Sequence, residues 1–170
     1  MRVTSAYANK ILKQLNEEKE YWLNKEKESM IYTASADEDP VIPDYDYDDV
    51  SERLNQIDKK ICNIKHAINK SNINSVIEVF GEEYSIDCLL VRMAQISKRK
   101  MTLDKMRKKM PKSRIEDDYY SRKPFVEYRY VNYDIERVKN DYDEISRLLF
   151  EMQLKLDEHN QKVEFEIDFE

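Results

Sequence analysis

The feature that most constrains this chain of 170 residues is its single glycine, Gly81. Glycine is the residue that most readily adopts a positive φ angle and lets the backbone approach a ligand closely. Dinucleotide-binding folds, phosphate loops and β-sandwiches depend on several such positions, and they are therefore disfavoured. Long helices joined by few turns are the natural alternative. The length fits one domain, so we expect a single helical domain over residues 1–170.

Charge and composition narrow the classes of protein further. Charged residues make up 38% of the chain, which leaves little apolar material for a core, and the net charge of -6 disfavours a general affinity for nucleic acid. Cys62 and Cys88 are too few and too far apart for a zinc knuckle or a disulfide framework. The chain shows no apolar run of membrane-spanning length and no apolar signal core at Met1–Ser5, so we expect a cytoplasmic protein without a membrane partner.

Apolar residues that recur at spacings of three and four predict four helices. The strongest periodic signal is the seam that begins at Val50 and ends at Ile68. We expect the helices from Thr4 or Ser5 to about Ile31, from Val50 to Ile68, from Ser85 or Asp87 to Pro111, and from Asn132 or Asp134 to Leu156.

The remaining segments predict loops and short strands. Residues 33–49 hold two prolines and seven carboxylates without Lys or Arg, which is typical of an acidic loop. Gly81 divides two alternating runs within 75–86, a pattern that predicts a β-hairpin. Residues 125–131 are rich in β-branched and aromatic residues, and 163–169 alternate between apolar and acidic, so both should be strands.

Narrow helical seams on so charged a chain bury little area within one subunit. The predicted fold class is therefore mainly α: four long helices in a bundle, with a small β-hairpin and short strands, assembling as a homo-oligomer. The free edge of the C-terminal strand is a second candidate for contacts between subunits.

No recognisable catalytic centre appears in the sequence. His66 and His159 have no nearby Ser or Cys at a spacing that suggests an activated nucleophile, so we interpret both as solvated. The acidic loop lacks the alternating ligands, central glycine and closing Glu of an EF-hand, so we interpret it as a solvated linker. We therefore expect a protein that is not an enzyme and has neither a metal site nor a cofactor.

A basic segment lies between Arg92 and Arg114, where ten cations face a single acid, Asp104. One interpretation is a face that pairs with the acidic loop or with the Glu-rich first helix, in the same subunit or a neighbour. The other interpretation is a site for an anion. The ten cations are Arg92, Lys98, Arg99, Lys100, Lys105, Arg107, Lys108, Lys109, Lys112 and Arg114.

Five tyrosines, one phenylalanine and three cations follow between Tyr119 and Tyr133. Guanidinium groups bind phosphate and aromatic faces stack on bases, so this combination suits a phosphorylated ligand that carries a base. A strand with half-buried tyrosines is the alternative. Strand alternation places Tyr128 and Tyr130 on the face opposite Arg129, so only one of these sets can point into a given pocket.

Five segments occur in one order along most of the chain: Asn69–Asn72, the hairpin before the third helix, Leu90–Arg92 with the basic run after it, Tyr120–Arg122, and Leu156–Asn160. Together they resemble a small prokaryotic family of mostly uncharacterised helical proteins, some of which are labelled septicolysin. The resemblance implies a helical protein with small β elements that forms a ring-like homo-oligomer, a hexamer. Nothing in the chain resembles a membrane-inserting segment, so the cytolysin label gains no support.

The chain also resembles, more loosely, the sponge proteins, which are small helical phage proteins that sequester nucleotide immune signals. The similarity lies in size, apparent assembly and lack of catalytic residues. The leading hypothesis is therefore a non-enzymatic homo-oligomer that binds and sequesters a small anionic ligand of nucleotide type, as an anti-defence sponge. The alternative is a structural or protein-interaction module without a small ligand. The candidate ligand-binding residues are Arg92, Arg99 and Arg107 on the third helix, with Tyr120, Arg122, Tyr128, Arg129 and Tyr130 after it.

Overall fold

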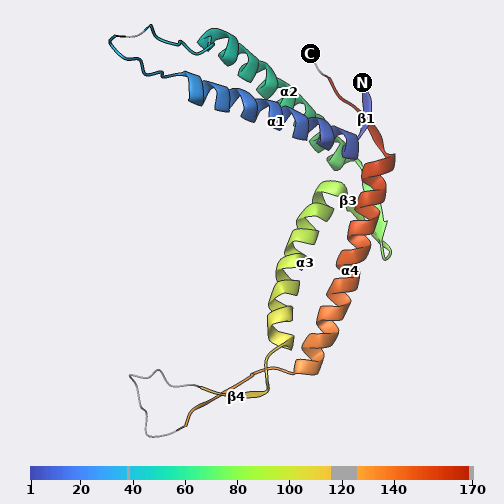
Figure 1. Cartoon of the computed structure of the whole chain (residues 1–170). Coiled ribbons are helices and arrows are strands. Elements are labelled where there is room, and N and C mark those ends of the chain that lie inside the picture. Colours follow the sequence, from blue (N-terminus) through green and yellow to red (C-terminus); the bar gives the residue numbers. More distant parts are fainter. Residues whose placement is uncertain (38, 116–125, 169–170) are drawn as a thin grey trace. The chain divides into compact units, whose positions relative to one another are not determined.

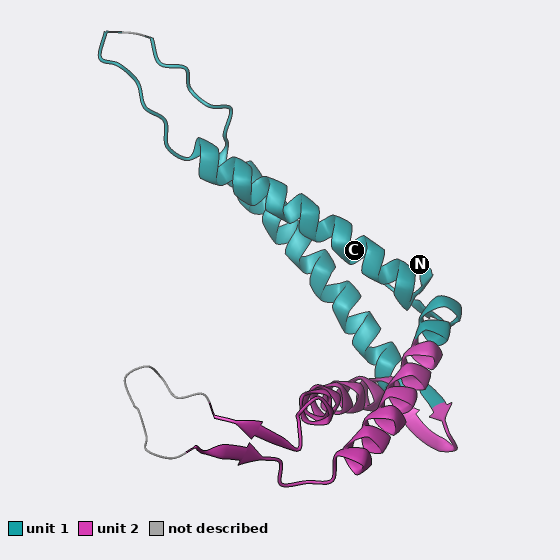
Figure 2. Ribbon diagram, turned by 60° about the horizontal axis from the view of Figure 1, so that its bottom comes forward, with its two compact units in different colours: residues 1–77, 157–170 teal, residues 78–156 magenta. Residues whose placement is uncertain are grey.

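The computed structural model describes residues 1–37, 39–115 and 126–168 (Figure 1). The protein is mainly helical, with four long helices and short antiparallel strand pairs, as predicted. None of the helices in the described ranges is long and apolar enough to cross a membrane. The chain divides into two compact units, residues 1–77 with 157–170 and residues 78–156 (Figure 2), where we had expected a single domain.

The first unit is built on an antiparallel pair of helices, α1 (Ser5–Ser29) and α2 (Tyr47–Asn74) (Figure 1). Thr4 is the N-cap of α1, as predicted, and its hydroxyl accepts a hydrogen bond from the Tyr7 N–H at 3.3 Å. The predicted seam of α2 is buried at intervals of seven residues, at Val50, Ile57 and Ile64. The sequence periodicity therefore identified the face on which this pair packs.

A two-stranded sheet closes the first unit at the ends of these helices. Strand β1 (Arg2–Thr4) pairs antiparallel with β6 (Glu164–Glu166), with Val3 opposite Phe165. The Met1 amino group and the Ile167 N–H each donate to the other residue's carbonyl oxygen, at 2.8 and 2.9 Å. Val3 and Ile167 join Ala8, Leu12 and Ile64 in one buried cluster, so the sheet covers the end of the helix pair.

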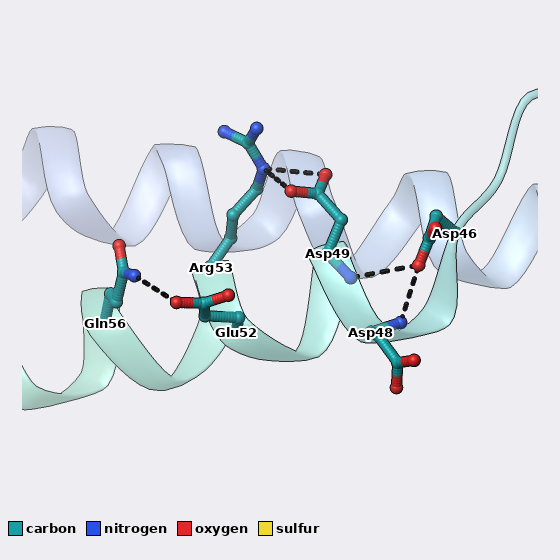
Figure 3. Close-up of polar contacts among 6 residues, drawn as sticks. All are labelled: Asp46, Asp48, Asp49, Glu52, Arg53 and Gln56. Atoms are coloured by element: carbon teal, nitrogen blue, oxygen red, sulfur yellow. Dashed lines mark hydrogen bonds and ion pairs between the residues drawn. The ribbon is translucent and has the colours of Figure 1, made fainter.

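The acidic loop ends earlier than predicted, because α2 begins at Tyr47 rather than after Asp49. Asp46 is the N-cap, and its carboxylate accepts hydrogen bonds from the N–H groups of Asp48 (2.9 Å) and Asp49 (3.1 Å) (Figure 3). Asp49 in turn accepts from Arg53 Nε, at 2.9 and 3.0 Å. Acidic residues suit the first turn of a helix because they compensate its dipole, which explains why an acidic run continues into α2.

The second unit begins within the hairpin formed by β2 (Val76–Val79) and β3 (Glu82–Ser85), which corresponds to the hairpin expected at 75–86. Its turn residues Phe80 and Gly81 have φ angles of 51° and 84°, as a type I′ turn requires. Gly81 meets this requirement without strain, whereas phenylalanine rarely adopts a positive φ.

Helices α3 (Ile86–Arg107) and α4 (Ile135–Lys162) follow, and the part of α4 up to Leu156 belongs to the second unit. Leu89, Ile96 and Leu103 form a buried stripe on α3 with a spacing of seven. Tyr142 of α4 lies against α3, with its ring centroid 4.0 Å from Arg107 Cζ. Each helix of this unit therefore buries one narrow face, as the sequence pattern predicted.

In the chain, α3 and α4 are connected by an antiparallel ribbon of β4 (Lys112–Arg114) and β5 (Tyr128–Tyr130) (Figure 1). β5 falls within the strand predicted at 125–131. β4 was not predicted.

One prediction in the first unit was wrong. His159, expected to be solvated near the end of α4, is 7% exposed, and neither ring nitrogen has a hydrogen-bond partner in the described part of the chain. Three residues earlier on α4, Leu156 is also buried. His159 therefore continues the buried face of α4 by one turn.

Candidate functional site

The most distinctive surface of the second unit is a groove of about 780 Å³ between the C-terminal end of α3 and the β4–β5 ribbon. This volume falls within the range of about 300–1,000 Å³ that is typical of small-molecule sites. We call it the ribbon groove. It is lined by Thr102, Lys105, Met106, Lys108, Lys109, Met110, Ser113, Arg129, Tyr130, Val131, Asn132 and Tyr133.

Helical periodicity explains why α3 presents lysines to the ribbon groove. Thr102 and Lys105 are three residues apart, so they lie on one face near the end of α3, and Lys109 lies in the turn that follows Arg107, the last residue of α3. At about 100° per residue this face is well separated from the buried stripe that contains Leu103. The lysines can therefore extend into solvent while the opposite face of α3 packs.

The end of α3 is fixed by two hydrogen bonds to one carbonyl group. The Tyr133 hydroxyl donates to the Met106 carbonyl oxygen at 2.8 Å, and the Lys109 N–H donates to the same oxygen at 3.1 Å. Tyr133 lies just before α4, so its hydroxyl joins the segment after β5 to the end of α3. This contact positions one wall of the groove.

The register of the ribbon decides which side chains share a face. Lys112 pairs with Tyr130, Ser113 with Arg129, and Arg114 with Tyr128. Because side chains alternate along a strand, Ser113 and Arg129 lie on one face and the two tyrosines on the other. On the tyrosine face, Lys112 Nζ lies 3.9 Å from the Tyr128 ring centroid and 5.5 Å from that of Tyr130.

All charged side chains among the described residues that line the ribbon groove are positive. Among the described residues its lining includes three lysines and Arg129 and no carboxylate. Lys108 forms an ion pair with Asp104, whereas Lys105, Lys109 and Arg129 have no ion pair to any residue that the structure describes. A groove whose charged side chains are all positive attracts anions and repels cations.

Other hollows of the molecule differ in charge. A neighbouring hollow of about 540 Å³, which shares Tyr133 and Lys109 with the groove, also contains Asp134 and Glu136. In the first unit, a hollow of about 630 Å³ between α2 and β6 combines Lys70 with Glu164, Glu166 and Asp168. An anionic ligand is therefore best matched by the ribbon groove.

Arg107, a predicted ligand-binding residue, is already engaged. Its guanidinium donates to Asp104 at 2.7 and 2.9 Å and lies on the Tyr142 ring. Hydrogen bonds from Lys108 and then from Arg107 lower the pKa of Asp104, which keeps its carboxylate charged and the contacts in place. Arg107 therefore connects α3 to α4 and does not line the ribbon groove.

The other predicted residues fall into three groups. Arg129 and Tyr130 line the groove, and Tyr128 lies next to Tyr130, with 6.5 Å between their ring centroids. Arg92 and Arg99 are exposed on α3 but lie about 20 Å and 9 Å along its axis from Lys105, at 1.5 Å per residue. The structure does not bring these two arginines to the groove. Tyr120 and Arg122 lie outside the described residues.

Sequence reasoning did not select Lys105, Lys109, Met110 or Ser113 for the site. The two lysines belong to the basic run that was noted, and a helical projection would have separated their face from that of Arg92 and Arg99. Met110 is 72% exposed despite lying on the predicted apolar seam, because α3 ends at Arg107. Ser113 gave no signal, since its position depends on the pairing of β4 with β5.

The groove offers binding chemistry. Lysine ammonium groups and one guanidinium can hold phosphate or carboxylate oxygens. Tyr130 is 64% exposed, but its ring lies on the face of the ribbon opposite Arg129. Within the described ranges, no three His, Cys, Asp or Glu side chains are close enough together to hold a metal ion. Among the described residues of the lining, neither the Thr102 nor the Ser113 hydroxyl forms a hydrogen bond with a lysine side chain.

Comparison with known proteins supports the fold. No protein-family model matches the sequence, and no curated protein matches it. The chain is similar to a solved structure described as a functionally unknown conserved protein from Corynebacterium diphtheriae. The two share 12% sequence identity with a TM-score of 0.69, over 98% of this chain and 100% of the other. At this identity the likeness shows the fold alone.

Proposed function

We propose that this protein is a non-enzymatic, homo-oligomeric protein that binds and sequesters a small anionic ligand of nucleotide type in the ribbon groove. The observation that carries the proposal is the convergence of Lys105, Lys109 and Arg129 from two elements on one groove without a carboxylate in its described lining. Tyr130 also contributes to the lining, but its ring lies on the face of the ribbon opposite Arg129, so the cations alone carry the proposal.

A purely structural role explains only part of this charge. Cations near the C-terminus of a helix compensate its dipole, and Lys105 in the last turn of α3 suits that role. Arg129 comes from β5 and lies on the face of the ribbon that also carries Ser113. The dipole of α3 gives no reason for a cation on a separate strand, whereas an anionic ligand does.

Self-association is part of the proposal. Each unit contains one pair of long helices, and each helix buries a single narrow stripe. Large apolar side chains such as Val91, Met101 and Phe150 remain exposed within the second unit. Burial of such residues between copies would add the apolar area that each unit lacks.

Native mass spectrometry of the purified protein, before and after mixing with ADP-ribose derivatives and cyclic nucleotides, tests the proposal. Discrete adducts of unmodified ligand mass on an intact oligomer are the expected result. An oligomer that binds none of these compounds would favour a structural or protein-interaction module instead. Conversion of a bound nucleotide by the purified protein would contradict the non-enzymatic assignment.

A further inference from the structure

The segment between α1 and α2, residues 30–46, carries exposed apolar side chains within an acidic sequence. Val41 is 92% exposed and Ile42 is 65% exposed, between Pro40 and Pro43. Burial of this pair against an apolar surface of a partner would be favourable, because both side chains are largely exposed to water. We call residues 37 and 39–46 the acidic segment.

Charges on both sides of this apolar pair are also without partners. Asp37, Asp39 and Asp44 form no ion pair with any residue in the described ranges. The acidic segment ends at Asp46, whose carboxylate is used as the cap of α2, and Asp49 just beyond it pairs with Arg53 (Figure 3). The three carboxylates without an ion pair therefore lie before Asp46 and Asp49, whose carboxylates form contacts within α2.

The ribbon groove has the complementary pattern. Its free cations, Lys105, Lys109 and Arg129, surround an apolar surface that includes the exposed side chain of Met110 and Val131. An extended segment with an apolar centre and flanking carboxylates would place apolar residues on apolar residues and acids on cations. Complementary charge of this kind fixes register and speeds association.

We propose that the acidic segment of one copy docks in the ribbon groove of a second copy, with Val41 and Ile42 on the apolar surface. Pro40 and Pro43 restrict the backbone on both sides of this pair, which reduces the entropy lost on docking. The same cations would serve the small anion of the proposed function, so the two occupants would compete for the groove, while the exposed apolar side chains of the helices would still hold the copies together when the ligand is bound. The inference does not require that function, since the segment and the groove are both present in the chain.

The occupant is a second copy, because each unit buries only narrow stripes and large apolar side chains such as Val91, Met101 and Phe150 stay exposed, which favours contacts between copies.

Charge exchange on the full-length chain tests the docking. One variant reverses the groove, Lys105→Glu with Lys109→Glu, and the other reverses the segment, Asp39→Lys with Asp44→Lys. Sedimentation equilibrium should show that each variant alone self-associates at least tenfold more weakly than the wild type. The two variants mixed should associate again, because a basic segment then meets an acidic groove.

Two further variants keep the test clear of folding effects. Lys59→Glu with Lys60→Glu makes the same change in net charge on exposed α2 positions and should leave self-association unchanged. Val41→Asp removes an apolar contact at a position that is almost fully exposed, so it should weaken association while the circular dichroism spectrum stays the same.

The outcomes separate the two proposals. A wild type that is monomeric at all concentrations would overturn docking between copies, and so would charge-reversed variants that associate as the wild type does. If mixing restores association while no nucleotide binds, the inference stands and the proposed function fails. If nucleotides bind and charge reversal leaves association intact, only the inference fails.

Discussion

Replacement of Lys105 and Lys109 by glutamine should weaken the binding of a doubly charged anion about tenfold at physiological salt. Lys105, in the last turn of α3, and Lys109, just after the helix, both line the ribbon groove and have no ion pair among the described residues, so their charges are available to a ligand. Removing them takes away two attractive charges from a surface that has no carboxylate in its described lining.

The size of the effect follows from Coulomb's law. At a mean separation of about 6 Å in a water-like dielectric, each pair of unit charges contributes about 0.7 kcal/mol. Two lysines and two ligand charges make about four pairs, or about 2.8 kcal/mol before screening. A Debye length of about 8 Å at 0.15 M salt reduces this to about 1.3 kcal/mol, close to tenfold in Kd. At 0.01 M salt the same sum gives about 2.3 kcal/mol, close to fiftyfold.

Isothermal titration calorimetry with ADP-ribose at both salt concentrations measures these ratios. Lys59→Gln with Lys60→Gln is the matched control, because it removes the same charge from exposed positions on α2. Equal losses of affinity in the two double variants would show that net charge, and not the groove, attracts the anion. A loss that does not change with salt would refute the electrostatic reasoning.

Three other substitutions test particular contacts. Asp104→Asn removes the carboxylate that pairs with Lys108 and should tighten binding of the doubly charged anion about 1.5-fold at 0.15 M salt and about threefold at 0.01 M salt, since two charge pairs about 10 Å apart contribute about 0.8 kcal/mol before screening; an unchanged Kd would count against this. Because ion pairs lower the pKa of Asp104, they stabilise the fold above the ordinary range of that carboxyl and are lost as pH falls through its lowered pKa. The asparagine variant should therefore lose less stability on acidification in urea unfolding. Phe80→Asn should raise the free energy of unfolding by about 1 kcal/mol, since asparagine tolerates the positive φ of that turn position; a loss of stability would mean that the phenylalanine ring packs. Asp46→Ala removes the cap of α2 and should cost about 1 kcal/mol in thermal unfolding, whereas Asp44→Ala, two residues earlier, should cost nothing measurable.

The helices could be predicted because each buries one stripe with a regular spacing. Leu89, Ile96 and Leu103 on α3 show the same interval in the sequence as in the structure. Boundaries were less accurate, because they depend on capping: Asp46 starts α2 within a run that had been assigned to the loop. The burial of His159 was missed because a polar residue at this position gives no sign in the sequence that the buried face of α4 extends beyond Leu156.

Two strands could not be predicted from their own residues. β1 and β4 are three residues long: Arg2–Thr4 alternates polar and apolar residues but is too short to give a signal, and Lys112–Arg114 has no apolar residue at all. Each forms because a partner distant in sequence supplies the hydrogen bonds. The composition of the candidate site was predictable as a basic and tyrosine-rich region, but its members depend on where α3 ends and on the register between Ser113 and Arg129.

The pairing of β1 with β6 also affects how the chain folds during synthesis. The first unit is completed by residues on both sides of the second, since β1 waits for a strand that is translated roughly 160 residues later. At about 5–20 residues per second, this interval is about 8–30 s. During that time Val3 and its apolar neighbours on α1 lack the cover that Ile167 provides. A ribosome-bound chain would therefore expose this surface to chaperones until β6 emerges, although both long helices of the first unit are already synthesised.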